Sequence, residues 1–363
     1  MLQRSFSRRN FLATTAAAAA FPTILSGKEA VLGQGDFKYR LVPDWGVLGP
    51  KTPVKNCHGI VCTREGHIIL LTDEVKNNVI VYDSNGKLLH KWGHDYPGAH
   101  GLSLVVENER EVLYFTDLGR GMVFKATLSG EILNQWAWPE ASGKYEKSRQ
   151  YRPSWTLHTP NGDFFVLDGY GRDYIMHYGA DGSLKKTFGG KEGGIKHWGP
   201  HGGITDLRDP ANPALLIAMS DQQELLRLDL DGKILGSTPL PGGNPRHLHQ
   251  NGKHFFVPHL ADNWPADRNS RGFISILDDD LHVVANIAGS APHYDDDGKL
   301  QPMKTTAPIF MHPHDLTVGK DDSLYVAQFD SGNTYPLKLE RIKIRLQPIS
   351  PKQISSLTTH NEP

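Results

Sequence analysis

Six short apolar runs recur along the chain, and each ends in or directly before an aspartate. They are HIILLTD to Asp73, VLYFTD to Asp117, FFVLD to Asp168, LLIAMSD to Asp221, FFVPHLAD to Asp262 and LYVAQFD to Asp330. The runs are rich in β-branched and aromatic residues, too short for helices and bounded by turn residues, which is typical of buried strands. This repeat constrains the fold strongly, because it predicts one structural unit that is used six times.

A second pattern follows most of these runs, in which an alternating strand, a tight turn and another strand succeed one another. Examples are NVIVYDSNGKLLHKWG, MVFKATLSGEILNQWA, YIMHYGADGSLKKTFG and LLRLDLDGKILGS. Asn-Gly, Ser-Gly and Asp-Gly pairs favour hairpins because glycine accepts the positive φ that such turns need. Each unit is therefore predicted to be a four-stranded antiparallel meander of about 40 to 50 residues, which is the length of a propeller blade.

The whole pattern predicts an all-β chain that forms a six-bladed β-propeller over residues 37–347. The last unit supplies only three strands, and the segment FKYRLVPDW near residue 40 is expected to supply the fourth and close the ring. Closure matters because it removes exposed sheet edges. Two insertions in the fifth unit, NWPADRNSRG and SAPHYDDDGKLQPMKTTAPIF, are expected to cover a functional face.

The two ends of the chain differ from the repeat. Residues 1–30 begin with the stretch SRRNFL, followed by LATTAAAAAF, and this matches a twin-arginine export signal. The apolar part is too short for a permanent membrane anchor. We therefore predict a protein exported to the periplasm or across the plasma membrane of a bacterium without a stable anchor, and a flexible tail over residues 348–363.

Charge and histidine content narrow the partners. The formal net charge is -1 and the pI is near 7.0, so the chain has no global attraction for nucleic acid. A small-molecule or peptide-derived substrate is the expected partner. Eighteen histidines against six methionines provide a rich supply of imidazole, which is the commonest metal ligand.

Histidines recur where the first strand of each predicted blade begins. The segments CHGIV, AHGLSL, PHGGIT and PHDLTV place His58, His100, His201 and His314 at one register, and RHLHQ places His247 nearly there. First strands line the channel of a propeller, so these residues are expected to form a ring around its axis. Neutral imidazoles that converge with one open coordination position describe a catalytic zinc-type site. The alternative is that they only form hydrogen bonds inside a polar channel.

The segments AHGLSL, VLDGYGRDYI, GPHGGI and FMHPHDLTV resemble the peptidyl-α-hydroxyglycine α-amidating lyase domain, a six-bladed propeller of the NHL-repeat type. In that family three histidines at first-strand entrances bind catalytic zinc. The resemblance implies this role for His100, His201 and His314.

The same resemblance implies further site residues. It implies that Tyr170 acts near the substrate hydroxyl, and that Asp315 holds a structural calcium ion together with the main-chain carbonyls of Ile60 and Leu102. His312 stands where the family has a methionine, and the sequence does not explain it.

The family's two catalytic arginines have no counterpart here, because their places are taken by Asp73 and by Asp221-Gln222. Arg246 and Arg152 stand at blade entrances and are candidates to replace them in binding a carboxylate, a task that suits the planar guanidinium. Both arginines are therefore predicted to be catalytic-site residues.

Three functions are consistent with these observations. The first is an exported zinc-dependent lyase related to the amidating lyase, with a substrate that has diverged. The second is a non-catalytic NHL-type propeller that binds protein or carbohydrate. The third is a calcium-dependent lactonase-like hydrolase, which would be expected to have carboxylate and asparagine ligands in its channel, and the histidine-rich entrances argue against it.

Overall fold

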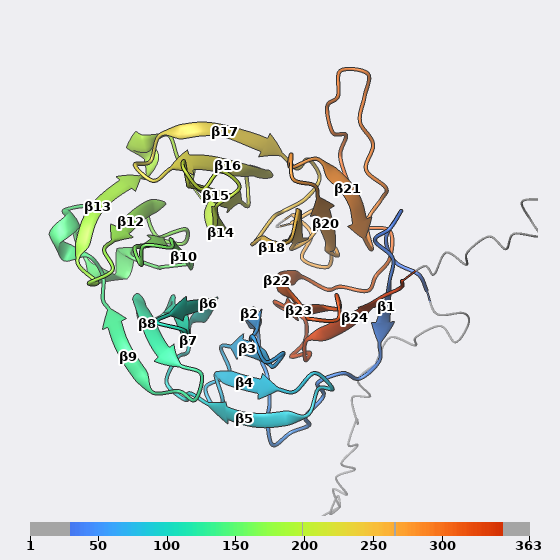
Figure 1. Ribbon diagram of the computed structural model, residues 1–363, viewed down its shortest axis with the longest axis horizontal. Coiled ribbons are helices and arrows are strands. Elements are labelled where there is room, and N and C mark those ends of the chain that lie inside the picture. The colour runs from blue at the N-terminus through green and yellow to red at the C-terminus, as the bar shows by residue number, and fades with distance from the viewer. Residues whose placement is uncertain (1–29, 198, 265, 344–363) are drawn as a thin grey trace, which may run out of the picture.

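The computed structural model describes residues 30–343 except 198 and 265. Its strands form six four-stranded antiparallel sheets that surround a central axis as the blades of a propeller (Figure 1). The predicted all-β, six-bladed fold is confirmed. The signal segment and the C-terminal tail predicted from the sequence lie outside the described residues. Within them, no helix has the length and apolar character needed to span a bilayer.

Blades 1 to 3 each use four consecutive strands. Blade 1 contains β2 (Cys57–Cys62), β3 (Ile68–Thr72), β4 (Val79–Tyr82) and β5 (Leu88–Trp92). Blade 2 contains β6 (Ala99–Glu107), β7 (Arg110–Asp117), β8 (Met122–Thr127) and β9 (Ile132–Trp136). Blade 3 contains β10 (Trp155–His158), β11 (Phe164–Leu167), β12 (Tyr174–Tyr178) and β13 (Leu184–Gly189).

Blades 4 and 5 repeat this order, and blade 6 is completed from the other end of the chain. Blade 4 contains β14 (Pro200–Asp206), β15 (Ala214–Met219), β16 (Glu224–Asp229) and β17 (Ile234–Pro239). Blade 5 contains β18 (His249–Asn251), β19 (His254–His259), β20 (Phe273–Leu277) and β21 (Val283–Ile287). Blade 6 contains β22 (Pro313–Val318), β23 (Leu324–Gln328), β24 (Leu337–Arg341) and β1 (Tyr39–Val42).

Strand β1 closes the ring, as the segment FKYRLVPDW predicts. It pairs antiparallel with β24, with Tyr39 opposite Arg341 and Val42 opposite Lys338. The first and last strands of the propeller therefore share one sheet, which leaves no open gap between blade 6 and blade 1 (Figure 1).

The hydrophobic core lies between the blades. All residues of β3 and β15, the second strands of blades 1 and 4, are buried, whereas most residues of the outermost strands β5 and β9 are exposed. A second strand is covered on both faces because neighbouring blades pack against it. This explains why the repeated apolar runs are continuous instead of alternating.

Candidate metal centre

Four histidines enter the channel from the first strands of their blades. In β2, β6, β14 and β22 the pairing register with the second strand shifts at His58, His100, His201 and His314, respectively. Such a β-bulge leaves a residue outside the hydrogen-bonded ladder and re-aims its side chain. All four side chains are buried. The sequence predicts that these four histidines occupy the same position in their strands, and in the structure each of them lies at a β-bulge.

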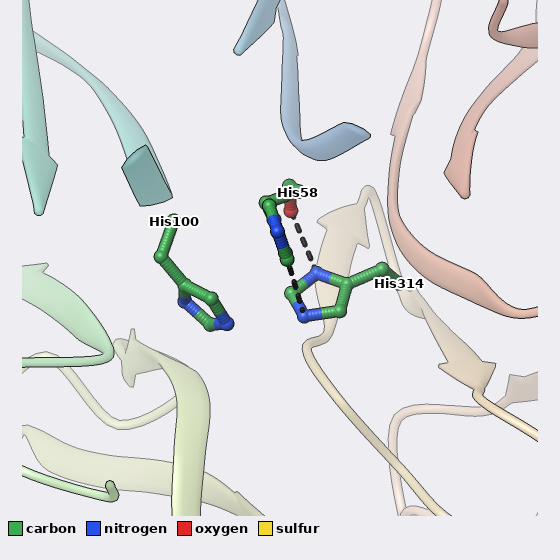
Figure 2. Close-up of side chains that lie close together, drawn as sticks. All are labelled: His58, His100 and His314. Atoms are coloured by element: carbon green, nitrogen blue, oxygen red, sulfur yellow. Dashed lines mark hydrogen bonds between the residues drawn. The ribbon is translucent and has the colours of Figure 1, made fainter. Parts of the chain in front are cut away.

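The rings of these histidines lie close together. Those of His100, His201 and His314 form a nearly equilateral triangle, with centroid distances of 4.9 Å, 4.8 Å and 4.7 Å. His58 lies 4.7 Å from both His100 and His314 by the same measure. The channel therefore holds two groups of three imidazoles that share one edge, and Figure 2 shows the group that includes His58.

The group in Figure 2 has the more compact set of nitrogens. One ring nitrogen each of His58, His100 and His314 lies within 4.8 Å of the others, a separation that a single metal ion can bridge. His201 is outside this set, and its Nε2 accepts a hydrogen bond of 2.9 Å from the hydroxyl of Tyr170. The structure thus supports a metal site of histidines, and it offers His58 and His201 as alternative third members.

Three of the four imidazoles are held in the same way by the next blade. In each, Nδ1 donates to a main-chain carbonyl: His100 to Ser154 at 2.9 Å, His201 to Arg246 at 2.7 Å and His314 to His58 at 2.8 Å. A donating Nδ1 leaves Nε2 with a free lone pair, and it fixes the orientation of the ring. Metal-binding histidines are commonly oriented by such a bond.

Glycine after the histidine allows the next blade to come this close. A Cβ at Gly101 would lie 2.3 Å from the carbonyl oxygen of Ser154, and one at Gly202 would lie 2.6 Å from that of Arg246. These are the same oxygens that accept the Nδ1 hydrogen bonds. In these two His-Gly pairs, the glycine therefore leaves space for the carbonyl oxygen that accepts the hydrogen bond from Nδ1 of the histidine.

The remaining nitrogens fit a metal ion. Nε2 of His100 is buried and has no hydrogen-bond partner among the described residues. Nε2 of His314 lies 3.4 Å from Nδ1 of His58, a contact drawn in Figure 2. A buried nitrogen without a partner is costly, and a bound cation would satisfy it.

Burial keeps these imidazoles neutral. It lowers the pKa of His58 to about 3, with the charge of Arg246 as the second cause. It also lowers the pKa of His100, His201 and His314 well below the usual histidine range. Neutral imidazole is the form that binds metal, so the site is ready for an ion near neutral pH.

Tyr170 lies in a turn that a buried carboxylate stabilises. Asp168 accepts hydrogen bonds from the amides of Arg152, at 2.6 Å, and Arg172, at 2.7 Å, and from the hydroxyl of Tyr145 at 2.8 Å. The turn brings the Tyr170 hydroxyl to the metal site. Burial raises the pKa of Tyr170, so the phenol is protonated near neutral pH.

The two predicted arginines lie in different environments. The side chain of Arg246 is buried and lines a cavity of about 370 Å³ next to the histidines. Arg152 is exposed, and its guanidinium carbon lies 6.0 Å from the centre of the Tyr170 ring. The structure therefore places Arg246 in the cavity wall, whereas Arg152 lies near the ring of Tyr170 and is not among the residues that line the cavity.

Two aromatic residues of the cavity wall were not predicted from the sequence. Besides Tyr170, His201, His314 and Arg246, the lining includes Trp264 and Phe329. Trp264 belongs to the first insertion of blade 5, which the sequence marks only as a loop over a functional face. Phe329 follows directly after β23, in a run that the sequence marks only as a strand.

The position expected for His247 requires a correction. We call the place that His58, His100, His201 and His314 occupy in their blades the channel position. In five blades, the main-chain carbonyl two residues before this position accepts a hydrogen bond from the amide of the residue that follows the second strand. These carbonyls belong to Asn56, Gly98, Gly199, Asn244 and His312. In blade 5 the count from Asn244 leads to Arg246. His247 is one residue further on, and it therefore does not join the histidine cluster.

His247 instead lies deeper in the channel with the residues predicted to hold calcium. Its Nδ1 donates to Oδ1 of Asp315 at 2.7 Å, while Oδ2 of Asp315 accepts from the amide of Ile60 at 2.8 Å. Leu102 packs against Gly59, the residue before Ile60, since its Cβ lies 2.4 Å from where a Cβ of Gly59 would be. Asp315 and Ile60 are thus hydrogen-bonded neighbours, and the calcium ion and the part of Leu102 in holding it stay predictions.

Comparison with known proteins supports the fold. No family model and no curated protein matches the chain. A solved structure of streptogramin B lyase has 17% identity and a TM-score of 0.53, covering 80% of this chain and 94% of that one. Virginiamycin B lyase from Staphylococcus aureus has 14% identity and a TM-score of 0.53, covering 84% of this chain and 100% of that one. At such low identities the likeness concerns the propeller fold alone.

Proposed function

We propose that the protein is an exported zinc-dependent lyase that cleaves a carbon–heteroatom bond in a small-molecule or peptide-derived substrate. In reaction type it would resemble the peptidyl-α-hydroxyglycine α-amidating lyase, whose sequence motifs this chain resembles. The observation that carries the proposal is the triangle of His100, His201 and His314, each with Nδ1 bound to the next blade.

His100, His201 and His314 would hold the zinc ion, and His58 stands next to them as a fourth possible ligand. Zinc supplies a Lewis acid that polarises a substrate oxygen. Two of the histidines, His201 and His314, line the cavity of about 370 Å³. A substrate in that cavity would therefore lie directly against the site, as an open coordination position requires.

Tyr170 is proposed as the proton donor. Its hydroxyl donates to Nε2 of His201 over 2.9 Å. Because this nitrogen would bind the zinc ion, the hydroxyl would exchange that bond for one to a substrate in the cavity, which Tyr170 also lines. Its raised pKa favours donation over abstraction of a proton. Arg246 is proposed to bind a substrate carboxylate from inside the cavity, and Arg152 is proposed to act through Tyr170, against whose ring it lies.

Two further assignments belong to this proposal. A calcium ion near Asp315, Ile60 and Leu102 would stabilise the channel below the zinc site. The segment SRRNFL at residues 7–12 would direct the protein through the twin-arginine route to the periplasm. The two solved structures described above are named as lyases, and these names agree with the proposed reaction class. Their likeness to this chain concerns the fold alone.

The test combines metal analysis with turnover. The mature protein is purified without chelators, its metal content is measured, and release of glyoxylate from an α-hydroxyglycine peptide is followed. About one zinc per chain, with zinc and turnover both lost in His201→Ala, is the expected result. The control is His282→Ala, since His282 is exposed and lies outside the cavity.

Other outcomes discriminate between the alternatives. Zinc without turnover of this peptide would restrict the proposal to a lyase with another substrate. Absence of any metal from protein that is folded and freshly purified would contradict it, and would favour the propeller that only binds protein or carbohydrate.

A further inference from the structure

The cavity beside the histidines contains a buried guanidinium that forms no side-chain hydrogen bond or ion pair with the described residues. The side chain of Arg246 is 8% exposed, and its Nε is buried with no hydrogen-bond partner. No ion pair of Arg246 is found within the described part of the chain. Among the described residues that line the cavity, Asp221 is the one carboxylate; it is exposed to water, and its charge only partly offsets the burial that lowers the pKa of Arg246. Burying an unpaired charge is costly, so this guanidinium is suited to an anion that comes from outside the protein.

The wall next to Arg246 is aromatic. Trp264 and Phe329 both line the cavity, and their ring centroids lie 6.2 Å apart at an interplanar angle of 81°. Phe329 also lies 5.4 Å from the ring of His58 and 6.3 Å from that of His314. Phe329 therefore links the histidine rings to Trp264 along one wall of the cavity. Such surfaces bind flat apolar groups of a ligand.

His312, which the sequence leaves unexplained, holds this wall in place. It is 1% exposed, its Nδ1 donates to the carbonyl of Phe329 at 3.1 Å, and its ring lies edge-on to Trp264 at 5.0 Å. The guanidinium carbon of Arg268 lies 4.7 Å from the centre of the Trp264 ring. Trp264 is thus in contact with two further side chains, His312 and Arg268, although it belongs to a loop.

From these contacts we infer that the cavity takes a small molecule in which a carboxylate is attached to a flat apolar or aromatic group. The carboxylate pairs with Arg246, and the flat group lies against Trp264 and Phe329. This inference rests on the proposed function in that it names the substrate class of the same site. The volume of about 370 Å³ agrees with it, because small-molecule sites have volumes of about 300 to 1,000 Å³.

The test measures binding of three probes to the mature protein by calorimetry at constant ionic strength. Benzoate carries both features, acetate carries only the charge, and benzamide carries only the ring with a neutral group. We expect benzoate to bind at least tenfold more tightly than either of the others. Measurement before and after treatment with a chelator separates pairing with Arg246 from direct binding to the metal.

Variants then assign the two features to their residues. Arg246→Gln should weaken benzoate at least tenfold, to the level of benzamide. Trp264→Ala should weaken benzoate to the level of acetate and leave acetate unchanged. Arg149→Gln is the matched control, because Arg149 is exposed and lies outside the cavity. If Arg246→Gln does not fold, Trp264→Ala and the three probes on the unaltered protein still decide the question.

Equal binding of benzoate and benzamide would overturn the inference, as would benzoate binding that neither variant weakens. The result is independent of the metal proposal. If benzoate binding depends on Arg246 in protein that carries no metal and has no turnover, the substrate class stands and the lyase assignment fails. If zinc and turnover are found but benzoate is not preferred, the lyase assignment stands and the inferred substrate class fails.

Discussion

Alternate blades of this propeller use the same channel position for different purposes. The even-numbered blades 2, 4 and 6 place His100, His201 and His314 there. The odd-numbered blades 1, 3 and 5 place His58, Ser154 and Arg246 there. The main-chain carbonyls of the odd-blade residues accept the hydrogen bonds from Nδ1 of the even-blade histidines. The even blades thus supply three of the four clustered imidazoles, and the odd blades supply the carbonyls that orient them. Because the orienting atoms belong to the main chain, the side chains of the odd blades are free to differ.

The difference shows how a six-bladed ring can carry a site with threefold symmetry. The side chain of Ser154 bonds to carbonyls of Leu167 and Pro200 and so stabilises the scaffold, whereas that of Arg246 enters the cavity. In the proposed zinc site, the even positions supply the ligands. The odd positions determine what lies around it.

The largest expected effect comes from loss of an even-blade ligand. His100→Ala should lower zinc affinity by more than about 100-fold, since loss of an orienting partner alone costs about 10- to 100-fold. His58→Ala should lower it by less than about tenfold if the even blades hold the ion. Competition with a chromophoric chelator measures both values. If zinc affinity falls further in His58→Ala than in His201→Ala, the ion is held by the group shown in Figure 2 and not by the three histidines of the even blades.

A second variant targets the contact between even and odd blades. Gly101→Ala places a Cβ 2.3 Å from the carbonyl oxygen of Ser154, so it should push the acceptor away from His100. We expect zinc affinity to fall by about 10- to 100-fold and the free energy of unfolding to fall by about 1–3 kcal/mol. Metal competition and urea denaturation measure the two effects. Gly193→Ala is the control, because no atom lies within 4 Å of its Cβ position; unchanged zinc affinity in Gly101→Ala would refute the role of this contact.

A third prediction separates buried histidines of the scaffold from those of the metal site. Burial lowers the pKa of His259, the last residue of β19, from 6.5 to about 3. Between these values the unfolded chain binds more protons there than the folded chain, so stability is complete above about pH 6.5 and falls as the pH decreases. The slope should reach about 1.4 kcal/mol per pH unit for this group.

His259→Phe should remove that part of the acid sensitivity, since phenylalanine does not titrate and can keep the stacking on Phe273, now at 4.5 Å. Denaturation of metal-free protein between pH 7 and about 4 provides the measurement. An identical pH slope in the variant and the parent would show that His259 is not a source of the sensitivity.

The smallest expected effect concerns an odd-blade side chain. Ser154→Ala removes the hydroxyl that bonds to Leu167 and Pro200 but keeps the carbonyl that accepts from His100. We expect a loss of about 1 kcal/mol of stability with zinc affinity within about twofold of the parent. A large loss of zinc affinity would mean that the odd-blade side chains contribute to the site after all.

Much of this arrangement can be predicted from the sequence, because the strand period and the turn residues act locally. The segment FKYRLVPDW is predicted as the closing strand, and β1 occupies that place. The channel register of His58, His100, His201 and His314 follows from counting along similar strands. Counting fails in blade 5, where β18 begins only at His249 and the channel position belongs to Arg246 instead of His247.

The sequence by itself determined the six blades, their closure and the approach of histidines to one axis, since each depends on patterns within a few residues. Only the tertiary structure decided which imidazoles face one another, which carbonyl orients each ring, and that Trp264, Phe329 and His312 meet beside Arg246. These contacts join residues that are far apart in the chain, and their distances depend on how closely the blades pack around the channel. No local pattern in the sequence specifies that packing.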